Sequence, residues 1–333
     1  MSNNNKKIIG YSAIIILIFL IPANMFVSYF LLINRETNIP NNIEQKCNIK
    51  EEKFKERKIF IIEPKDTVNI KKEIFYFHGG AYVAEATKNH WEFLQKLAID
   101  LNARIYMPDY PLTPKNNYKD VYEMVEPFYL EYIKKVELKN LYVMGDSAGG
   151  GLALGLMEKI SKSVFTSQNA DDLRNTETSQ NVNLTKSNSL LKKEASLDNK
   201  NILPQKIILI SPWLDVRLNN PEIDSVQKKD KILNKNNLQI VGQHYAGSDG
   251  INSYLVNPID GDLSKLNNIT ILTGTNDILN PDVHKLKEIA EKQGVTINIK
   301  EYEEANHIWF IENNSSKELI EKGYNDLLDV INE

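Results

Sequence analysis

The chain has 333 residues, a formal net charge of -4 and one cysteine, and 42% of its residues are hydrophobic. This length allows one large α/β domain or two small ones, and the hydrophobic content is sufficient for a sizeable core. The mild negative charge offers no basic surface for nucleic acid, and the single Cys47 excludes a disulfide within the chain and a cysteine-based metal site.

The N-terminal region departs most strongly from this average composition. Residues 8–33, IIGYSAIIILIFLIPANMFVSYFLLI, carry no charge. At about 1.5 Å per residue, a helix of this length crosses a hydrocarbon core of roughly 30 Å. Lys6 and Lys7 precede the stretch, in a short tail of residues 1–7. The pattern favours an uncleaved, single-pass signal anchor over a cleaved signal peptide or a soluble helix, so we expect a membrane protein with most of the chain on the extracytoplasmic side.

The rest of the chain is predicted to be a tether, residues 34–57, followed by an α/β domain, residues 58–333. Short, near-continuous apolar runs in this domain alternate with segments of helical periodicity. Such an alternation is typical of a mostly parallel sheet that is covered by helices on both faces. The predicted strands lie in residues 58–64, 71–80, 103–114, 139–147, 205–215, 268–277 and 295–304, and the predicted helices in residues 89–101, 118–136, 148–160, 282–294 and 317–333.

Two segments interrupt the alternation. Residues 161–201 are rich in Ser, Asn, Thr, Lys and Asp and contain few apolar residues, so we expect a disordered insertion. Residues 212–258 are longer than a connection between two strands requires, and they include Trp213, Tyr245 and Tyr254. We predict that this second segment is a helical lid over a substrate site, with its aromatic side chains exposed.

The sequence LYVMGDSAGG, residues 141–150, ends an apolar strand in small residues. A strand, then GDSAG, then a helix is the sequence context of a nucleophile elbow, in which a strained turn presents a reactive serine, here Ser147. Glycines two residues before and after the serine keep side chains from colliding with the neighbouring strand and helix. A plain strand-to-helix turn has the same composition, so the motif alone does not decide between the two.

A second motif is the glycine pair in FYFHGGAYV, residues 75–83, at the end of an earlier strand. Glycine leaves backbone N–H groups unobstructed. The N–H groups of Gly79 and Gly80, together with that of Ala148, are therefore predicted to form an oxyanion hole. His78 precedes the serine, which is not the hydrolase order of residues, so we expect it to brace the loop.

The remaining members of a catalytic site are expected after the serine, because hydrolases of this type have the order serine, acid, histidine. The strand NITILTGTND ends at Asp277, and the last strand is followed by EEANHIWF, which contains His307. We therefore predict a catalytic triad of Ser147, Asp277 and His307 at the carboxyl edge of the sheet. Asp146 is expected to brace the adjacent loops and to take no part in the chemistry.

From about residue 70 to the C-terminus, apart from the insertion, the chain resembles the hormone-sensitive-lipase-like branch of the α/β-hydrolases. The motifs that carry the resemblance, in the family's order and approximate spacing, are HGGAY, DYPLTP, GDSAGGGLAL, SPWLD, GTNDIL and HIWF. The resemblance implies an α/β-hydrolase fold, a lid built partly from residues 212–258, and a carboxylesterase acting on short or medium acyl chains. Membrane-anchored members of this branch also have one N-terminal span. Two positions depart from the family: Ala81 replaces the third glycine of HGGG, and KNNYKD follows Pro114, where Glu and then His-Pro are usual.

These features together predict a serine carboxylesterase that hydrolyses a small-molecule ester through an acyl-enzyme intermediate. The alternatives are an amidase, peptidase or deacetylase with the same triad, and a non-catalytic, membrane-anchored binding module. A non-catalytic module is expected to have lost a triad residue, whereas all three are present. The sequence implies no cofactor and no metal, and it leaves the oligomeric state open.

Overall fold

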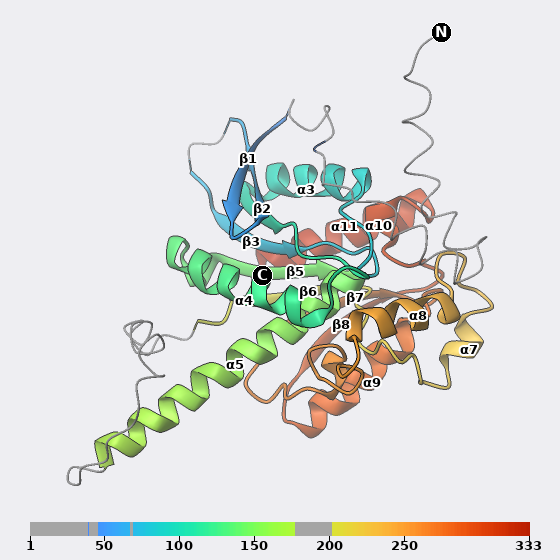
Figure 1. The fold of residues 1–333 in the computed structure, drawn as a ribbon. Helices are drawn as coiled ribbons and strands as arrows, with labels where there is room; N and C mark the ends of the chain where they lie inside the picture. Colours follow the sequence, from blue (N-terminus) through green and yellow to red (C-terminus); the bar gives the residue numbers. More distant parts are fainter. Residues whose placement is uncertain (1–38, 40–45, 67–68, 177–201) are drawn as a thin grey trace.

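The computed structural model of the chain describes residue 39 and residues 46–66, 69–176 and 202–333; for residues 164–176 it describes the backbone alone. The described strands form one sheet in the order β1-β2-β4-β3-β5-β6-β7-β8 (Figure 1). The pairs from β4 through β8 are parallel, and β2 pairs antiparallel with both β1 and β4. The mostly parallel sheet is therefore confirmed. The bounds are β1 Cys47–Phe54, β2 Arg57–Pro64, β3 Lys72–Phe77, β4 Ala103–Pro108, β5 Leu141–Asp146, β6 Lys206–Ile210, β7 Ile269–Gly274 and β8 Ile297–Tyr302.

Helices lie on both faces of the sheet, as predicted (Figure 1). One apolar cluster joins α3, α10 and α11 to one face, and a second joins α4, α5 and α9 to the other. The central strands β5 and β7 are buried at every residue, which explains why they appear in the sequence as uninterrupted apolar runs. The bounds are α3 Lys88–Leu101, α4 Tyr118–Tyr132, α5 Ser147–Thr176, α7 Ile223–Val226, α8 Lys235–Ala246, α9 Asn280–Lys292, α10 Trp309–Glu312 and α11 Lys317–Asn332, with 3-10 turns η1 Ile133–Lys135, η2 Leu138–Asn140 and η4 Pro258–Asp260.

The predicted tether is wrong over part of its length. Residues 47–54 form β1, which pairs with β2 from Cys47↔Pro64 to Phe54↔Arg57. Its sequence, CNIKEEKF, is mostly polar because β1 is an edge strand and most of its residues stay at least partly exposed. A strand with so little buried surface gives no apolar run that could be recognised in the sequence.

The predicted membrane location is contradicted by the structure. Among the residues that the structure describes, none belongs to a helix that is both long enough and apolar enough to cross a membrane. The predicted tail, residues 1–7, and the predicted span, residues 8–33, lie outside the described residues. The predicted membrane anchor and the extracytoplasmic location that depends on it are therefore not supported.

The predicted disordered insertion begins too early. The backbone of α5 continues as a helix to Thr176, well past the predicted start at residue 161. Residues 161–176 contain neither Gly nor Pro, so nothing in this stretch breaks a helix that a buried N-terminal half has already nucleated. The remainder, residues 177–201, lies outside the described part of the chain.

The segment 212–258 contains the two helices α7 and α8, but its aromatic side chains are not exposed as predicted. Trp213 and Tyr245 are buried, and Tyr254 is half-buried. The ring of Tyr245 stacks on that of Tyr82 with a centroid distance of 3.6 Å, and Trp213 stacks on the same tyrosine at 5.8 Å. These two side chains therefore form a packed layer with Tyr82, which belongs to the glycine loop after β3.

Candidate active site

The turn between β5 and α5 is a strained elbow at Ser147. The serine has a φ of 51°, in the left-handed region that a residue with a Cβ avoids. A Cβ added at Gly145 would collide with the carbonyl oxygen of Gly149, and one added at Gly149 would collide with that of Phe77. The glycines two before and two after the serine are therefore required by close backbone approach, as the motif predicted.

The structure brings the three predicted triad residues into one hydrogen-bonded chain. His307 Nε2 lies 2.9 Å from Ser147 Oγ, and His307 Nδ1 lies 2.8 Å from Asp277 Oδ2. The three residues follow β5, β7 and β8, whose carboxyl ends share one edge of the sheet because the strands are parallel. The order is that of a nucleophile, a base and the acid that orients the base.

Neighbouring loops hold the imidazole in place. The carbonyl oxygen of His307 accepts a hydrogen bond of 3.0 Å from the side chain of Asn314, and the N–H of Ile308 donates to Ser211 Oγ at 3.2 Å. His307 is 3% exposed and Ser147 is 7% exposed. The reacting atoms are therefore almost fully withdrawn from water, which strengthens the interactions between charges there.

The charges around His307 favour its protonated form. Burial acts to lower the pKa of His307, but the charge and hydrogen bond of Asp277, and then the charges of Asp230 and Asp146, outweigh burial and raise the pKa above its ordinary value. The imidazole is thus a stronger proton acceptor than a free histidine, which suits a general base.

The carboxylate of Asp146 fastens the glycine loop to the sheet. It accepts hydrogen bonds from Tyr76 Oη at 2.6 Å and from the N–H of Gly79 at 2.8 Å, and its second oxygen lies 3.1 Å from His90 Nε2. Burial acts to raise the pKa of Asp146, but His90 and these hydrogen bonds hold it below its ordinary value. The expected bracing role of Asp146 is confirmed.

The same hydrogen bond corrects the predicted oxyanion hole. The N–H of Gly79 already donates to Asp146, so it is not available for a substrate oxygen. The next two residues, Gly80 and Ala81, have φ values of +117° and +52°, and no hydrogen bond is described for their N–H groups within the described part of the chain. The direction of an N–H depends on the local φ and ψ, which a run of glycines leaves undefined.

His78 braces this loop, as predicted. Its Nδ1 lies 2.7 Å from the carbonyl oxygen of Gly79, and its ring stacks on Tyr110 with a centroid distance of 4.5 Å. Burial, assisted by the charge of His90, lowers the pKa of His78 to about 4. The ring is therefore neutral at pH 7 and serves as a packing element.

A family model for the alpha/beta hydrolase fold matches residues 74–311, which is more than half of the chain. The chain belongs to the α/β-hydrolase family.

Individual relatives of this α/β-hydrolase are esterases and related hydrolases. The chain is 27% identical over 231 residues to an esterase of Acinetobacter venetianus, a match covering 69% of this chain and 64% of that protein. It is 21% identical over 239 residues to an acetyl-hydrolase of Streptomyces hygroscopicus, covering 72% and 68% respectively. The chain thus spans about two thirds of the length of these two relatives. A solved esterase structure from the bacterial hormone-sensitive lipase family is similar in fold, with a TM-score of 0.70 at 17% identity over 100% of this chain and 99% of that chain.

Sequence reasoning missed two buried residues of this α/β-hydrolase site, His90 and Asp230. His90 shares the buried face of α3 with Phe93, Leu94 and Leu97, and that spacing could have identified it as a buried residue. Asp230 lies in the polar sequence QKKDKILNK, and its hydrogen-bond partners are backbone groups. Nothing in the sequence distinguishes it from a surface aspartate.

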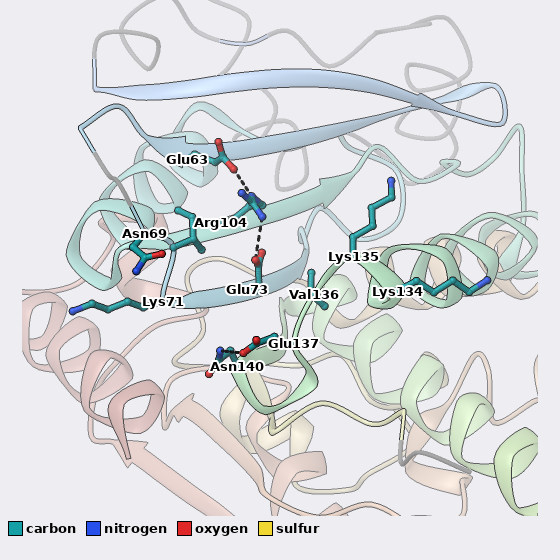
Figure 2. A pocket seen from close by; sticks show the side chains of 11 residues that line it. Glu63, Asn69, Lys71, Glu73, Arg104, Lys134, Lys135, Val136, Glu137 and Asn140 are labelled. Atoms are coloured by element: carbon teal, nitrogen blue, oxygen red, sulfur yellow. Dashed lines mark hydrogen bonds and ion pairs between the residues drawn. The ribbon is translucent and has the colours of Figure 1, made fainter. Parts of the chain in front are cut away.

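A cavity of about 740 Å³ is lined by residues that do not include the triad. Figure 2 shows its lining. Its lining includes Glu73 at the start of β3 and Arg104 at the start of β4, and so belongs to the amino edge of these strands. Arg104 bridges Glu73 at 3.1 Å and also contacts Glu63. Among the described residues, no group of three or more His, Cys, Asp or Glu side chains could hold a metal ion. The hydrogen-bonded chain of Ser147, His307 and Asp277 at the carboxyl edge is the candidate site.

Proposed function

We propose that this α/β-hydrolase is a serine carboxylesterase that acts through an acyl-enzyme intermediate. The observation that carries the proposal is the hydrogen-bonded chain from Ser147 through His307 to Asp277, with the serine on a left-handed elbow. The esterase and acetyl-hydrolase relatives support the same class of reaction.

The reaction begins when His307 Nε2 accepts the proton of Ser147 Oγ while this oxygen bonds to the ester carbonyl carbon. The bond to the alkoxy oxygen then breaks, and His307 gives its proton to the departing alcohol. Water attacks the resulting acyl-enzyme in the same way, with His307 as the base, and the carboxylic acid is released. Asp277 keeps a proton on Nδ1, so that Nε2 is free to accept one.

The negative oxygen of the tetrahedral intermediate is assigned to the N–H groups of Gly80, Ala81 and Ala148. Ala148 is the second residue of α5, so its N–H has no partner within the helix and lies at the positive end of the helix dipole. Ala81 takes the place of the predicted Gly79, whose N–H is engaged by Asp146, while Gly80 and Ala148 are kept from the prediction. An alanine serves here as well as a glycine because the donor is a backbone group.

The acyl group is proposed to be short. Tyr82 immediately follows the oxyanion loop, and a Cβ added at Gly151, one helical turn after Ser147, would lie 3.1 Å from the Tyr82 hydroxyl oxygen. The N–H of Trp213 donates to the carbonyl oxygen of Ser147 at 2.8 Å. Tyr82, Trp213 and Tyr245 thus form a buried aromatic layer beside the nucleophile. The name of the acetyl-hydrolase relative is consistent with a small acyl group.

Labelling with a fluorophosphonate probe, combined with hydrolysis of p-nitrophenyl acetate, tests the proposal. We expect the unmodified chain to be labelled and active, and Ser147→Ala to lose both properties. Ser163→Ala is the matched control, because Ser163 lies about four and a half turns further along the same helix and is exposed. Equal labelling of the unmodified chain and Ser147→Ala would refute the assignment, and cleavage of aminoacyl amides in preference to esters would favour an amidase.

A further inference from the structure

We propose that Asp230 is a positioning residue of the hydrolytic site, which fastens the acid loop to the segment 212–258 and adds a negative charge near His307. This inference rests on the proposed ester hydrolysis. It concerns a carboxylate that belongs neither to the triad nor to the oxyanion loop.

Asp230 is held by three backbone N–H groups from two parts of the chain. Its Oδ1 accepts hydrogen bonds from Ile232 at 2.7 Å and from Leu233 at 2.8 Å, which closes a turn before α8. Its Oδ2 accepts a hydrogen bond of 2.9 Å from the N–H of Ile278, 48 positions further along the chain. Asp230 is 8% exposed. A buried carboxylate with these bonds joins the two segments firmly.

The position of Ile278 makes this connection relevant to the reaction, because it directly follows Asp277. The N–H of Leu279 donates to Asp277 Oδ1 at 2.9 Å, while the N–H of Ile278 donates to Asp230. Two successive N–H groups of the acid loop are thus bound by two different carboxylates. The bond from Leu279 fixes the Asp277 side chain, and the bond from Ile278 to Asp230 fixes the backbone that carries this side chain.

Asp230 also contributes to the charge around the imidazole. Three carboxylates act on His307: Asp277 from the loop after β7, Asp230 from the segment between α7 and α8, and Asp146 from the end of β5. Each favours the protonated imidazole. Loss of the negative charge of Asp230 is therefore expected to lower the pKa of His307.

The substitution Asp230→Asn removes the charge of Asp230 and its hydrogen bond to Ile278 while the volume of the side chain stays nearly the same. An asparagine retains one oxygen for the N–H groups of Ile232 and Leu233, but its amide nitrogen then faces the N–H of Ile278 and the two donors repel each other. The matched control is Asp282→Asn. Asp282 is buried like Asp230, and burial raises the pKa of each to about 6, but Asp282 binds Asn220 and is not among the charges that act on His307.

We expect Asp230→Asn to lower kcat for p-nitrophenyl acetate by about tenfold, with KM changed less than about twofold, because the loop that orients His307 is loosened. The acid limb of the kcat/KM profile should move to lower pH by about 0.5 to 1 unit. Asp282→Asn should leave both kcat and the acid limb unchanged. Asp230→Ser is a second variant: its hydroxyl can still cap the local turn but is too short to reach Ile278, and it should show the same shift.

An acid limb that does not move in either Asp230 variant would overturn the proposal, whatever happens to Tm, because a merely structural carboxylate leaves the pKa of His307 unchanged. An equal shift in Asp282→Asn would overturn it as well. If the unmodified chain hydrolyses no ester and is not labelled by the fluorophosphonate, the proposed function fails and this inference fails with it. If the unmodified chain is active and the acid limb stays in place, this inference alone fails.

Discussion

His307 Nε2 lies 2.9 Å from Ser147 Oγ, although the two residues are 160 positions apart in the chain. This proximity follows from the sheet, because β5 and β8 are parallel and their carboxyl ends lie at one edge with only β6 and β7 between them. The side chains at these ends are directed into one place by the elbow and by the loop after β8. Any change to the charge of the imidazole should therefore be visible in the reaction of the serine.

The first prediction concerns the Asp277–His307 pair. The unmodified chain should hydrolyse esters with an acid limb above pH 6.5, since neutral imidazole is the active form and the pKa of His307 is raised above that ordinary value. Asp277→Asn should lower kcat by about 10²- to 10⁴-fold, because an amide that donates to Nδ1 forces the proton onto Nε2. It should also move the acid limb to lower pH. Asp224→Asn, an exposed position on α7, is the control, and a pH profile of kcat/KM is the measurement.

The fold and the proximity of Ser147, Asp277 and His307 could be predicted because they depend on strand order, whereas other features depend on geometry that the sequence does not contain. Ser147 and Asp277 each follow a strand that is buried at every residue, and His307 follows the last strand of the sheet in chain order. Gly79 and Gly80 look equivalent in the sequence, and only the backbone reveals that the N–H of Gly79 is bound by Asp146. A residue whose role is defined by distant backbone N–H groups leaves no pattern in the sequence.

Edge position and burial explain the remaining errors. The sequence of β1 predicts a tether because an edge strand can remain largely polar. Trp213 and Tyr245 are predicted to be exposed, whereas both rings stack on Tyr82, which belongs to a loop more than a hundred residues earlier. The apolar surface that buries them is contributed by tertiary contacts, which local patterns do not report.

The second prediction concerns the glycine loop. In Gly79→Ala the added Cβ would collide with a carboxylate oxygen of Asp146 and lie 3.1 Å from Ser147 Cβ. The loop must then shift, and we expect kcat to fall by at least about tenfold because the oxyanion donors move with it. Gly294→Ala is the control: Gly294 has a positive φ, of +77°, but no atom lies within 4 Å of the added Cβ. It should cost about 1 kcal/mol of stability and leave kcat unchanged. Unaltered kcat in Gly79→Ala would contradict the placement of this loop.

The third prediction tests the aromatic layer as a limit on acyl length. Tyr245→Ala removes a ring that stacks on Tyr82 at 3.6 Å and opens space beside the elbow. Hydrolysis of p-nitrophenyl esters from acetate to decanoate should show a steep preference for acetate and butyrate in the unmodified chain. The kcat/KM ratio of octanoate to acetate should rise at least about tenfold in the variant, since a methylene in an apolar pocket contributes about 1 kcal/mol or more.

The control for this prediction is Tyr245→Phe, which keeps the stacked ring and removes only the hydroxyl. It should retain the profile of the unmodified chain. Thermal unfolding of both variants checks that α8 remains folded. If a Tyr245→Ala variant is folded and active but keeps the original preference, the bound acyl chain does not lie against the aromatic layer.

The fourth prediction concerns Glu158, a fully buried carboxyl group on α5. Neither of its oxygens has a hydrogen-bond partner among the described residues. Burial raises the pKa of Glu158 well above its ordinary value; Lys162 opposes this shift, and the carboxylates of Asp262 and Asp260 add to it. The unfolded chain releases this proton near pH 4.5, while the folded chain retains it to a higher pH.

The contribution of Glu158 to stability is therefore complete below pH 4.5 and declines as the pH rises toward its folded-state pKa, by up to about 1.4 kcal/mol per pH unit. Glu158→Gln removes this titration while keeping the volume of the side chain. The difference in Tm between Glu158→Gln and the unmodified chain should increase steadily from pH 5 to pH 8, in favour of the variant. Glu288→Gln, an exposed position on α9, should give a difference that does not vary with pH. A constant difference for Glu158→Gln over the same range would mean that the buried carboxyl group is ionised in the folded protein and stabilised by a partner that its contacts do not reveal.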